Sequence, residues 1–167
     1  MQRLRAWRYW HWLRDAGLVL LFLLAIRAYQ QRDAASGVAP PLSGTDVHGQ
    51  PLVLAAYRGQ PVLVYFWATW CGVCKATQSN VDALARELPV LSIASQSGSA
   101  AEVTAYVREH GIVPKVVVDA QGALAKRFGV RAFPTTFVID RDGEIRHVEV
   151  GYTTELGLRL RMWLAAL

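Results

Sequence analysis

This 167-residue chain contains only two cysteines and four histidines. A structural zinc site normally takes four ligands from such side chains, and the two cysteines provide half of that number. The histidines are scattered along the chain, at His11, His48, His110 and His147. The sequence therefore argues against a structural zinc site, and we predict no bound cofactor.

Most of the chain carries almost no net charge. The net charge is +5, but residues 1–33 hold six arginines against two aspartates, and the remaining residues carry 12 basic and 11 acidic side chains. Proteins that bind nucleic acid gather Lys and Arg on one surface. No such cluster with interleaved aromatic residues occurs after residue 33, so we expect no nucleic-acid partner.

The chain also lacks an uncharged apolar run of the roughly 20 residues that a membrane-spanning helix needs. Its N-terminal apolar run, AGLVLLFLLAI, covers residues 16–26. Such a run has the length of a signal-peptide core, and it could also belong to a buried or surface helix of a cytosolic protein. However, no small-x-small cleavage site follows it directly, and Arg14 and Arg27 can extend outward from a span of residues 10–29. We therefore favour a single uncleaved membrane anchor, with interfacial aromatics at Trp7, Trp10, Trp12 and Tyr29.

The arginines near this run indicate its orientation. Four arginines precede the run and two follow it closely, and the more positive side stays in the cytoplasm. We predict a bacterial inner-membrane protein whose body faces the periplasm, an oxidising compartment. Residues 1–32 would form the cytoplasmic tail and anchor, residues 33–44 (DAASGVAPPLSG) a linker, and residues 45–167 the folded domain.

Hydrophobic periodicity after residue 44 alternates between strands and helices. Strands are predicted at residues 61–69, 90–95, 115–119, 135–140 and 145–150, and helices at residues 74–88, 99–110, 122–129 and 153–166. The first strand is a continuous β-branched and aromatic run, which is typical of a strand buried on both faces. This order predicts an α/β fold with a central mixed sheet flanked by helices. In the last helix we expect a core-facing apolar stripe of Leu156, Leu160, Met162, Trp163 and Leu164.

Both cysteines lie in the segment WATWCGVCKA, residues 67–76, directly after the predicted central strand. Cys71 falls at the predicted start of a helix, where free backbone N–H groups and the helix dipole favour an anion. We therefore expect a lowered thiol pKa for Cys71, which makes it the attacking thiolate. Cys74 follows one helical turn later and is less exposed, so it can resolve a mixed disulfide. Next to them, Trp70 is expected to form part of an exposed apolar rim that receives partner proteins.

Two other uses of the cysteine pair remain open. A purely structural disulfide across two residues would close a very small loop and stabilise the fold little. Copper(I) is a soft ion that two thiolates can bind with little further help, so a periplasmic Cu(I) carrier is the alternative function. Such a carrier would bind copper tightly and would show no disulfide turnover.

Two segments, FWATWCGVCK and GVRAFPTTFVIDRDG, resemble the thioredoxin fold and, within it, the membrane-anchored TlpA and ResA-like thiol-disulfide oxidoreductases. The resemblance implies that Pro134 is a cis-proline whose loop faces the cysteines and binds an extended substrate segment. Phe133 would line the same groove. Gly72 and Val73, between the cysteines, would contact the substrate, and this dipeptide would also tune the redox potential.

The Trp-rich basic anchor, the segment ASQSGSAAEV and the C-terminal GYTTELGLRLRMWLAAL extend this resemblance to the suppressor-of-copper-sensitivity protein D type. That type implies a periplasm-facing enzyme that is tethered to the inner membrane and uses a redox-active disulfide. It would exchange electrons with a membrane donor and with exported thiol proteins. Kinship with reductive TlpA-like proteins favours a reductant over an oxidase or isomerase.

Three features depart from the family pattern. Val73 replaces the proline that thioredoxin-like reductants often carry between the cysteines. Tyr65 and Thr77 occupy the places where thioredoxin and the ResA-like group carry a carboxylate, so proton transfer from Cys74 needs water or another group. Ser79 stands in place of a proline, which leaves no expectation of a helix kink there.

Overall fold

The computed structural model describes residues 12, 14–22, 25–26 and 32–167 of the chain. The chain divides into two units, residues 1–32 and residues 33–167. In the first unit, the described residues before Arg32 are helical. Among the described ranges, no helix is both long enough and apolar enough to cross a membrane. The predicted anchor lies partly outside these ranges. Its aromatic residues Trp7, Trp10 and Tyr29 lie outside the described residues.

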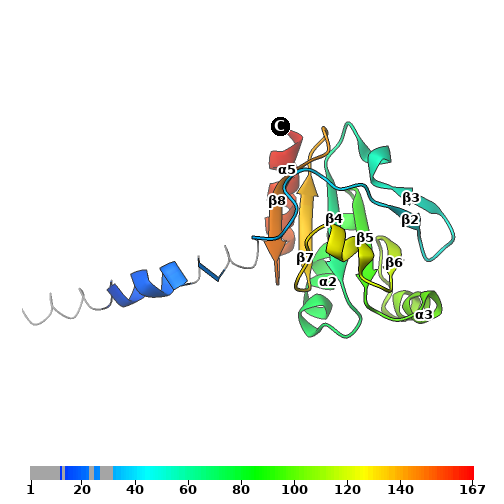
Figure 1. The fold of residues 1–167 in the computed structure, drawn as a ribbon, viewed down its shortest axis with the longest axis horizontal. Helices are drawn as coiled ribbons and strands as arrows, with labels where there is room; N and C mark the ends of the chain where they lie inside the picture. Colours follow the sequence, from blue (N-terminus) through cyan, green and yellow to red (C-terminus); the bar gives the residue numbers. More distant parts are fainter. Residues whose placement is uncertain (1–11, 13, 23–24, 27–31) are drawn as a thin grey trace, which may run out of the picture. The chain divides into compact units, whose positions relative to one another are not determined.

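A six-stranded mixed sheet forms the centre of the second unit (Figure 1). Its strands are β1 (Gly37–Val38), β4 (Val62–Trp67), β5 (Val90–Ser95), β6 (Lys115–Asp119), β7 (Thr135–Ile139) and β8 (Glu144–Val150). They lie in the order β1-β8-β7-β4-β5-β6. β4, β5 and β6 run parallel, whereas β7 and β8 are antiparallel to their neighbours. The predicted α/β fold with a central mixed sheet is confirmed.

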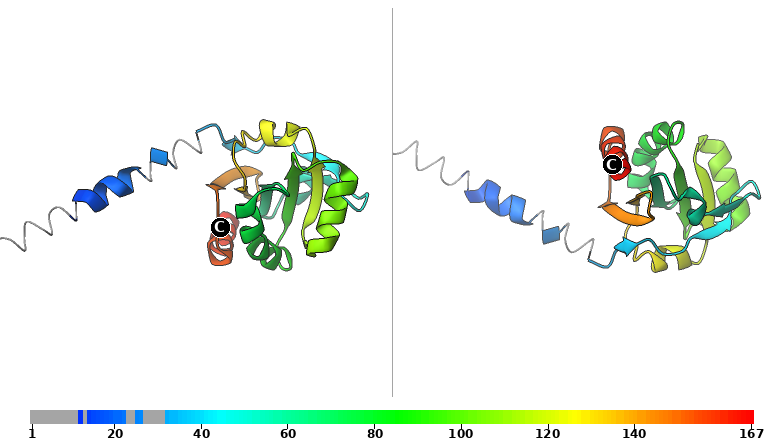
Figure 2. Two further views of the ribbon diagram at one scale, coloured as in Figure 1. Left: turned by 90° about the horizontal axis from the view of Figure 1, so that it is seen from below. Right: turned by 90° about the horizontal axis from the view of Figure 1, so that it is seen from above.

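Helices cover both faces of this sheet. Within residues 33–167 they are α2 (Gly72–Ala85), α3 (Ala100–His110), α4 (Ala123–Arg127) and α5 (Glu155–Ala166). Figure 2 shows α4 on one side of the sheet and α2, α3 and α5 on the other. The sequence pattern predicted all four helices, with ends that differ from the observed ones by up to three residues.

Side chains of β4 alternate between two hydrophobic clusters, because successive residues of a strand point to opposite faces of a sheet. The cluster beneath α2, α3 and α5 contains Leu63, Tyr65 and Trp67. The cluster beneath α4 and strand β3 (Pro51–Val53) contains Val62, Val64 and Phe66. All six residues are buried, which explains why the sequence of this strand is apolar without interruption.

Local capping determines where α2 and α3 begin. α2 starts at Gly72, two residues before the predicted start, because the Cys71 side chain caps it by accepting a hydrogen bond from the Cys74 N–H group. α3 starts after Ser99, which forms a capping box with Glu102. Each helix therefore begins close to the carboxyl end of the strand before it, and the cysteines lie at that edge of the sheet.

Residues 33–44, which the composition predicts to be a linker, pack with the second unit. β1 pairs with β8, the Ala35 N–H group donates a hydrogen bond to the Phe128 carbonyl, and Leu42 is 2% exposed. A high content of alanine, glycine and proline is typical of a linker, but it describes only the segment by itself. Here strand β8 and one face of the sheet supply backbone and apolar partners that composition does not reveal. Strand β2 (Ser43–Thr45), β3 and the short 3₁₀-helix η1 (Leu54–Tyr57) follow, and none of the three was predicted.

The apolar stripe predicted to face the core in α5 is wrong for four of its five residues. α5 buries Leu158, Met162 and Ala165. Leu156, Leu160, Trp163 and Leu164 are instead exposed. Apolar residues occur on nearly every side of this helix, so its sequence alone left the direction of the buried face open.

Candidate active site

The two cysteines lie where the chain passes from β4 into α2. Cys71 immediately precedes the first residue of the helix, and Cys74 lies in the first turn. A disulfide joins them, with the Cα atoms 5.2 Å apart. Cys71 is 7% exposed and Cys74 is 1% exposed, so the first cysteine is the more accessible, as its position in the sequence predicts.

The Cys71 sulfur lies at the N-terminal end of α2. It accepts a hydrogen bond from the Cys74 N–H group at 3.1 Å. The carbonyl oxygen of Phe133 lies 3.5 Å from the same sulfur. Unpaired N–H groups of the first helical turn and the helix dipole stabilise an anion at this place. The arrangement therefore favours a thiolate at Cys71 after reduction of the disulfide.

The loop before β7 faces Cys71. Its Phe133–Pro134 peptide bond is cis, as the resemblance implies. The Pro134 carbonyl accepts a hydrogen bond from the Gly151 N–H group at 2.8 Å, and the Thr135 hydroxyl donates one to the Ala132 carbonyl at 2.8 Å. These two bonds hold the loop against the start of β7 and the end of β8. Pro134 itself is buried, whereas Phe133 is partly exposed beside the sulfur.

Aromatic and apolar side chains surround the cysteines at the surface. Trp70 is 62% exposed and Val73 is 47% exposed. The Trp70 ring meets the Phe133 ring edge to face, with centroids 5.8 Å apart. Gly72 is also exposed, and a Cβ atom added there would meet no other atom within 4 Å. Trp70, Gly72, Val73 and Phe133 thus form one accessible border, which we call the cysteine rim.

The loop after β5 supports this rim, and the sequence reasoning did not identify it. The Trp70 indole N–H donates a hydrogen bond to the Gln96 carbonyl at 2.9 Å. The Ser97 hydroxyl accepts one from the Thr69 N–H group at 3.0 Å. The carboxyl ends of adjacent parallel strands share one edge of a sheet, so the parallel pairing of β4 and β5 is the signal that could have revealed this contact.

Two neutral hydroxyl groups lie where the resembling families carry carboxylates. The Tyr65 hydroxyl donates a hydrogen bond to the Cys74 carbonyl at 3.3 Å. Burial, with smaller contributions from Asp82 and Tyr106, raises the pKa of Tyr65 far above its ordinary value. The Thr77 hydroxyl donates to the Val73 carbonyl at 2.9 Å. Both side chains therefore act as hydrogen-bond donors to the backbone around Cys74.

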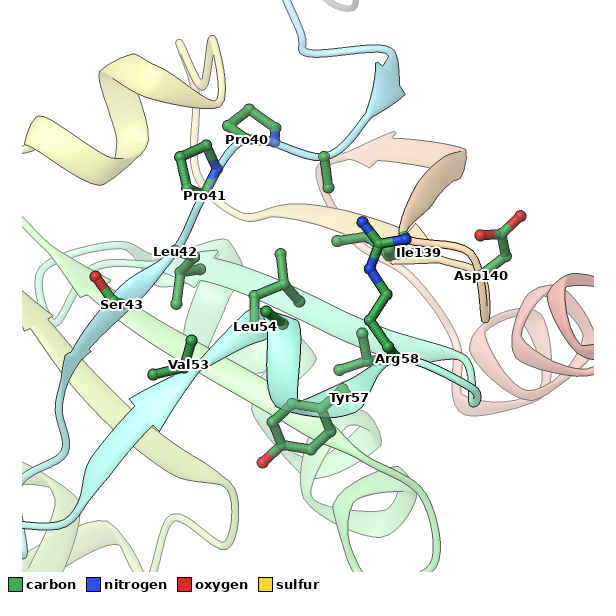
Figure 3. A pocket seen from close by; sticks show the side chains of 14 residues that line it. Pro40, Pro41, Leu42, Ser43, Val53, Leu54, Tyr57, Arg58, Ile139 and Asp140 are labelled. Carbon is green, nitrogen blue, oxygen red and sulfur yellow. The ribbon is translucent and has the colours of Figure 1, made fainter.

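A depression lies at the end of β4 that is far from the cysteines. This depression, which we call the proline hollow, has a volume of about 350 Å³ and is bordered by Pro40, Pro41, Tyr57, Arg58 and Asp140 among others (Figure 3). Val62 at the start of β4 lines it, whereas Trp67 at the end of β4 leads to the cysteines. Five residues of extended strand separate these ends by about 17 Å. The proline hollow is therefore distinct from the cysteine rim.

In the part of the chain that the structure describes, no group of three or more His, Cys, Asp or Glu side chains is arranged to hold a metal ion. His110 bonds through its ring nitrogen Nδ1 to the Tyr106 carbonyl at 3.0 Å, and its ring stacks on that of Tyr106. No histidine accompanies the two cysteine sulfurs in a described ligand cluster, so this geometry gives the Cu(I) carrier no support.

Comparisons with known proteins agree with this geometry. The Redoxin family matches residues 33–158. A thioredoxin-like protein of Haemophilus influenzae is 29% identical over 150 residues, which cover 89% of each chain. The thiol-disulfide oxidoreductase ResA of Geobacillus thermodenitrificans is 28% identical over 152 residues, covering 83% of this chain and 87% of the relative.

A solved structure has the same architecture. It is a thiol:disulfide interchange protein of the thioredoxin family from Chlorobium tepidum, with 28% identity and a TM-score of 0.66. The match covers 80% of this chain and 98% of the other. The fold of residues 33–167 is therefore thioredoxin-like, as the resemblance of the segments FWATWCGVCK and GVRAFPTTFVIDRDG implies.

Proposed function

Since this chain belongs to the Redoxin family and is a thiol-disulfide oxidoreductase, we propose that it reduces disulfides of exported proteins at the outer face of a bacterial inner membrane. The proposal places it with the suppressor-of-copper-sensitivity protein D type. Cys71 and Cys74 form the redox-active pair, and no cofactor takes part. The observation that carries the proposal is the Cys71 sulfur, which caps α2 and lies beside the Phe133 carbonyl.

The reaction proceeds by two thiol-disulfide exchanges. In the first, the Cys71 thiolate attacks one sulfur of a substrate disulfide, a mixed disulfide forms, and the other substrate sulfur leaves as a thiolate. In the second, the Cys74 thiolate attacks the Cys71 sulfur. The Cys71–Cys74 disulfide forms, and the second substrate sulfur leaves and takes up a proton. Two electrons thus pass to the substrate, and a membrane electron donor must restore the dithiol.

The cysteine rim is the proposed substrate-binding surface. Trp70 and Phe133 offer large apolar surfaces beside the attacking sulfur, and Gly72 leaves open space above the helix start. An extended substrate segment can lie between Val73 and the loop of Phe133 and Pro134, as extended peptides do when they bind beside a strand. Side chains of the substrate would then contact the rim while its disulfide reaches Cys71.

The proposed location rests on the N-terminal sequence. More arginines precede the apolar run of residues 16–26 than follow it, which favours a periplasmic body on a single-pass anchor. Tethering keeps the enzyme next to a membrane electron donor. A reductant is useful in this compartment because exported thiols there become oxidised, and copper promotes such oxidation.

Capture of the natural substrate tests this proposal most directly. In the full chain, Cys74→Ser leaves Cys71 able to attack but removes the thiol that resolves the mixed disulfide. Expressed in cells, this variant should accumulate mixed disulfides with exported proteins, seen as reducible bands on non-reducing gels. Cys71→Ser, with Cys74 retained, is the matched control and should trap none. Equal trapping by both variants would contradict the assignment of Cys71 as the attacking residue.

The redox potential tests the direction of electron flow. Equilibration of the Cys71–Cys74 couple with glutathione should give a potential close to that of thioredoxin, about −270 mV. A value near −120 mV would mark an oxidant and overturn the reductive role. Stoichiometric Cu(I) binding without any disulfide turnover would instead support a copper carrier.

A further inference from the structure

A cavity of about 250 Å³ lies beside Cys74, between α2 and α3. Cys74 and Trp67 contribute buried side chains to its lining, whereas Lys75, Ser79 and His110 contribute exposed ones. The cavity therefore runs from the buried cysteine to the surface. One water molecule occupies about 30 Å³ of liquid, and the lining is partly polar, so several water molecules fit.

Cys74 requires a proton acceptor. Its side chain is 1% exposed, and its thiol must lose a proton before it can attack the mixed disulfide. The hydroxyls of Tyr65 and Thr77 both donate to backbone carbonyls. Burial raises the pKa of Tyr65, so this phenol keeps its own proton at neutral pH. Neither group can accept the thiol proton.

Asp82 is the carboxylate that the cavity connects with Cys74. Cys74, Gln78 and Asp82 follow one another at four-residue intervals along the same face of α2, and all three line the cavity. The Asp82 oxygen Oδ1 accepts hydrogen bonds from Gln78 Nε2 at 2.9 Å and from the Val113 N–H group at 3.0 Å. Neither bond uses Oδ2. The side chain is thus fixed while its second oxygen can still accept a proton.

The electrostatics link Asp82 to the surroundings of Cys74. The Asp82 charge is one of the causes, after burial, that raise the pKa of Tyr65. Tyr65 in turn bonds the Cys74 carbonyl. The negative charge of Asp82 therefore acts on Tyr65, the residue of β4 that contacts Cys74.

The other titratable groups at the cavity fit this role less well. Lys75 on α2 carries an ammonium group, which has donors and no acceptor site. On α3, burial raises the pKa of Tyr106, with Glu109 adding to the effect, so Tyr106 also keeps its proton. His110 bonds through Nδ1 to the Tyr106 carbonyl, which leaves Nε2 as its acceptor atom, but it belongs to α3 and not to the helix that carries Cys74. Among the described residues that line the cavity, Asp82 is the one carboxylate, and two hydrogen bonds fix it on the face of α2 that also carries Cys74.

We propose that this cavity is the proton channel of the resolving thiol and that Asp82 receives the proton through water; the inference rests on the proposed function. Eight residues of helix correspond to about 12 Å, so Asp82 does not touch the sulfur and acts only through the water between them. The Cys74 thiol gives its proton to water, which passes one to the Asp82 carboxylate. The Cys74 thiolate then attacks Cys71, the Cys71–Cys74 bond forms, and the substrate sulfur leaves with the electron pair.

Two successive releases of thionitrobenzoate test this inference. The reduced full chain is mixed with dithiobis(nitrobenzoate): the first release reports the attack by Cys71, and the second reports resolution by Cys74. Asp82→Asn keeps an oxygen for the bonds from Gln78 and Val113. It should leave the first release within twofold of the wild-type rate and slow the second about tenfold or more at neutral pH.

The pH profile separates proton transfer from a structural effect. Without the carboxylate, the second release should accelerate with rising pH and approach the wild-type rate in alkaline solution, where the thiol ionises unaided. Asp82→Glu should restore most of the neutral rate. Glu109→Gln removes the same charge from an exposed position on α3 outside the cavity lining, and it should change the second release less than twofold.

Several outcomes would overturn the assignment. A faster second release in Asp82→Asn would mean that Asp82 acts on Cys74 only through its charge, which opposes ionisation of the thiol. An unchanged second release would exclude Asp82, and slowing by His110→Gln alone would transfer the role to His110. Loss of the first release in the wild-type chain would instead contradict the proposed function, so the two failures are distinguishable.

Discussion

The cysteine rim and the proline hollow lie at opposite ends of β4, and they differ in how their polar groups are used. At the hollow, polar groups are paired: the Arg58 guanidinium bonds the Asp142 carbonyl, and Asp140 accepts bonds from Asp142 N–H, Glu144 N–H and Arg146. Next to the rim, α2 begins, and the Cys71 sulfur accepts a hydrogen bond from the Cys74 N–H group of that helix. We therefore expect the reactive site where β4 ends and α2 begins. The volume of the proline hollow does not make it a reactive site.

The largest difference between the two ends should appear in turnover. Cys71→Ser in the full chain should reduce disulfide reduction to the uncatalysed rate, because no other side chain attacks the substrate sulfur. Arg58→Gln at the proline hollow should stay within twofold of the wild type. Reduction of insulin by dithiothreitol, followed by turbidity, measures both. Comparable losses of turnover in Cys71→Ser and Arg58→Gln would show that the cysteine rim and the proline hollow do not differ in activity.

A smaller effect is expected for substrate contact at the rim. Trp70→Ala should lower kcat/KM for a protein disulfide about tenfold, since exposed aromatic side chains dominate such interfaces. Its reaction with a small aliphatic disulfide should change less than twofold, because that substrate barely reaches the rim. Tyr57→Ala is the matched removal of an aromatic ring at the hollow. If the two variants lose activity toward the protein substrate equally, the rim is not the docking surface.

The smallest effect concerns stability at the proline hollow. Burial raises the pKa of the Asp140 carboxyl, but hydrogen bonds from Glu144 N–H, Arg146 and Asp142 N–H outweigh it and hold the pKa below its ordinary value. This carboxylate therefore stabilises the fold above the unfolded pKa, near 3.9, and the stabilisation is lost as pH falls through the folded value.

Asp140→Asn should lower the free energy of unfolding by about 1 kcal/mol at neutral pH and flatten its fall in acid. Urea unfolding at several pH values measures this change, and turnover at the rim should stay the same. Asp142→Asn, at an exposed turn position, is the control. A wild-type acid profile in Asp140→Asn would show that the paired carboxylate is not the group that titrates.

Much of the cysteine end could be predicted because its signals are local. Two cysteines two residues apart, after a buried strand and before a helix, indicate an attacker and a resolver from spacing alone. The segment FPTT, read with that pair, implied a cis bond at Pro134, which the structure contains. The contact of Trp70 with the Gln96 carbonyl was missed, because it depends on which strand lies beside β4.

The N-terminal stretch of the folded unit and the last helix were harder to predict, since their structure depends on distant partners. Residues 33–44 have the composition of a linker, yet β8 and the sheet face provide their contacts. In α5, apolar residues on several sides left the buried face undetermined, and packing against α2 and β7 selected Leu158 and Met162.

The sequence by itself determined the chemistry: a thiol pair at a helix start, the order of strands and helices from residue 61 onward, and the absence of carboxylates at Tyr65 and Thr77. These properties depend on residues that are close along the chain. Only the tertiary structure decided which groups surround Cys74, because Asp82 on α2, Tyr106 on α3 and Tyr65 on β4 meet only when the helices pack on the sheet. The cavity beside Cys74, through which we propose that the proton moves, is formed by this packing of helices on the sheet.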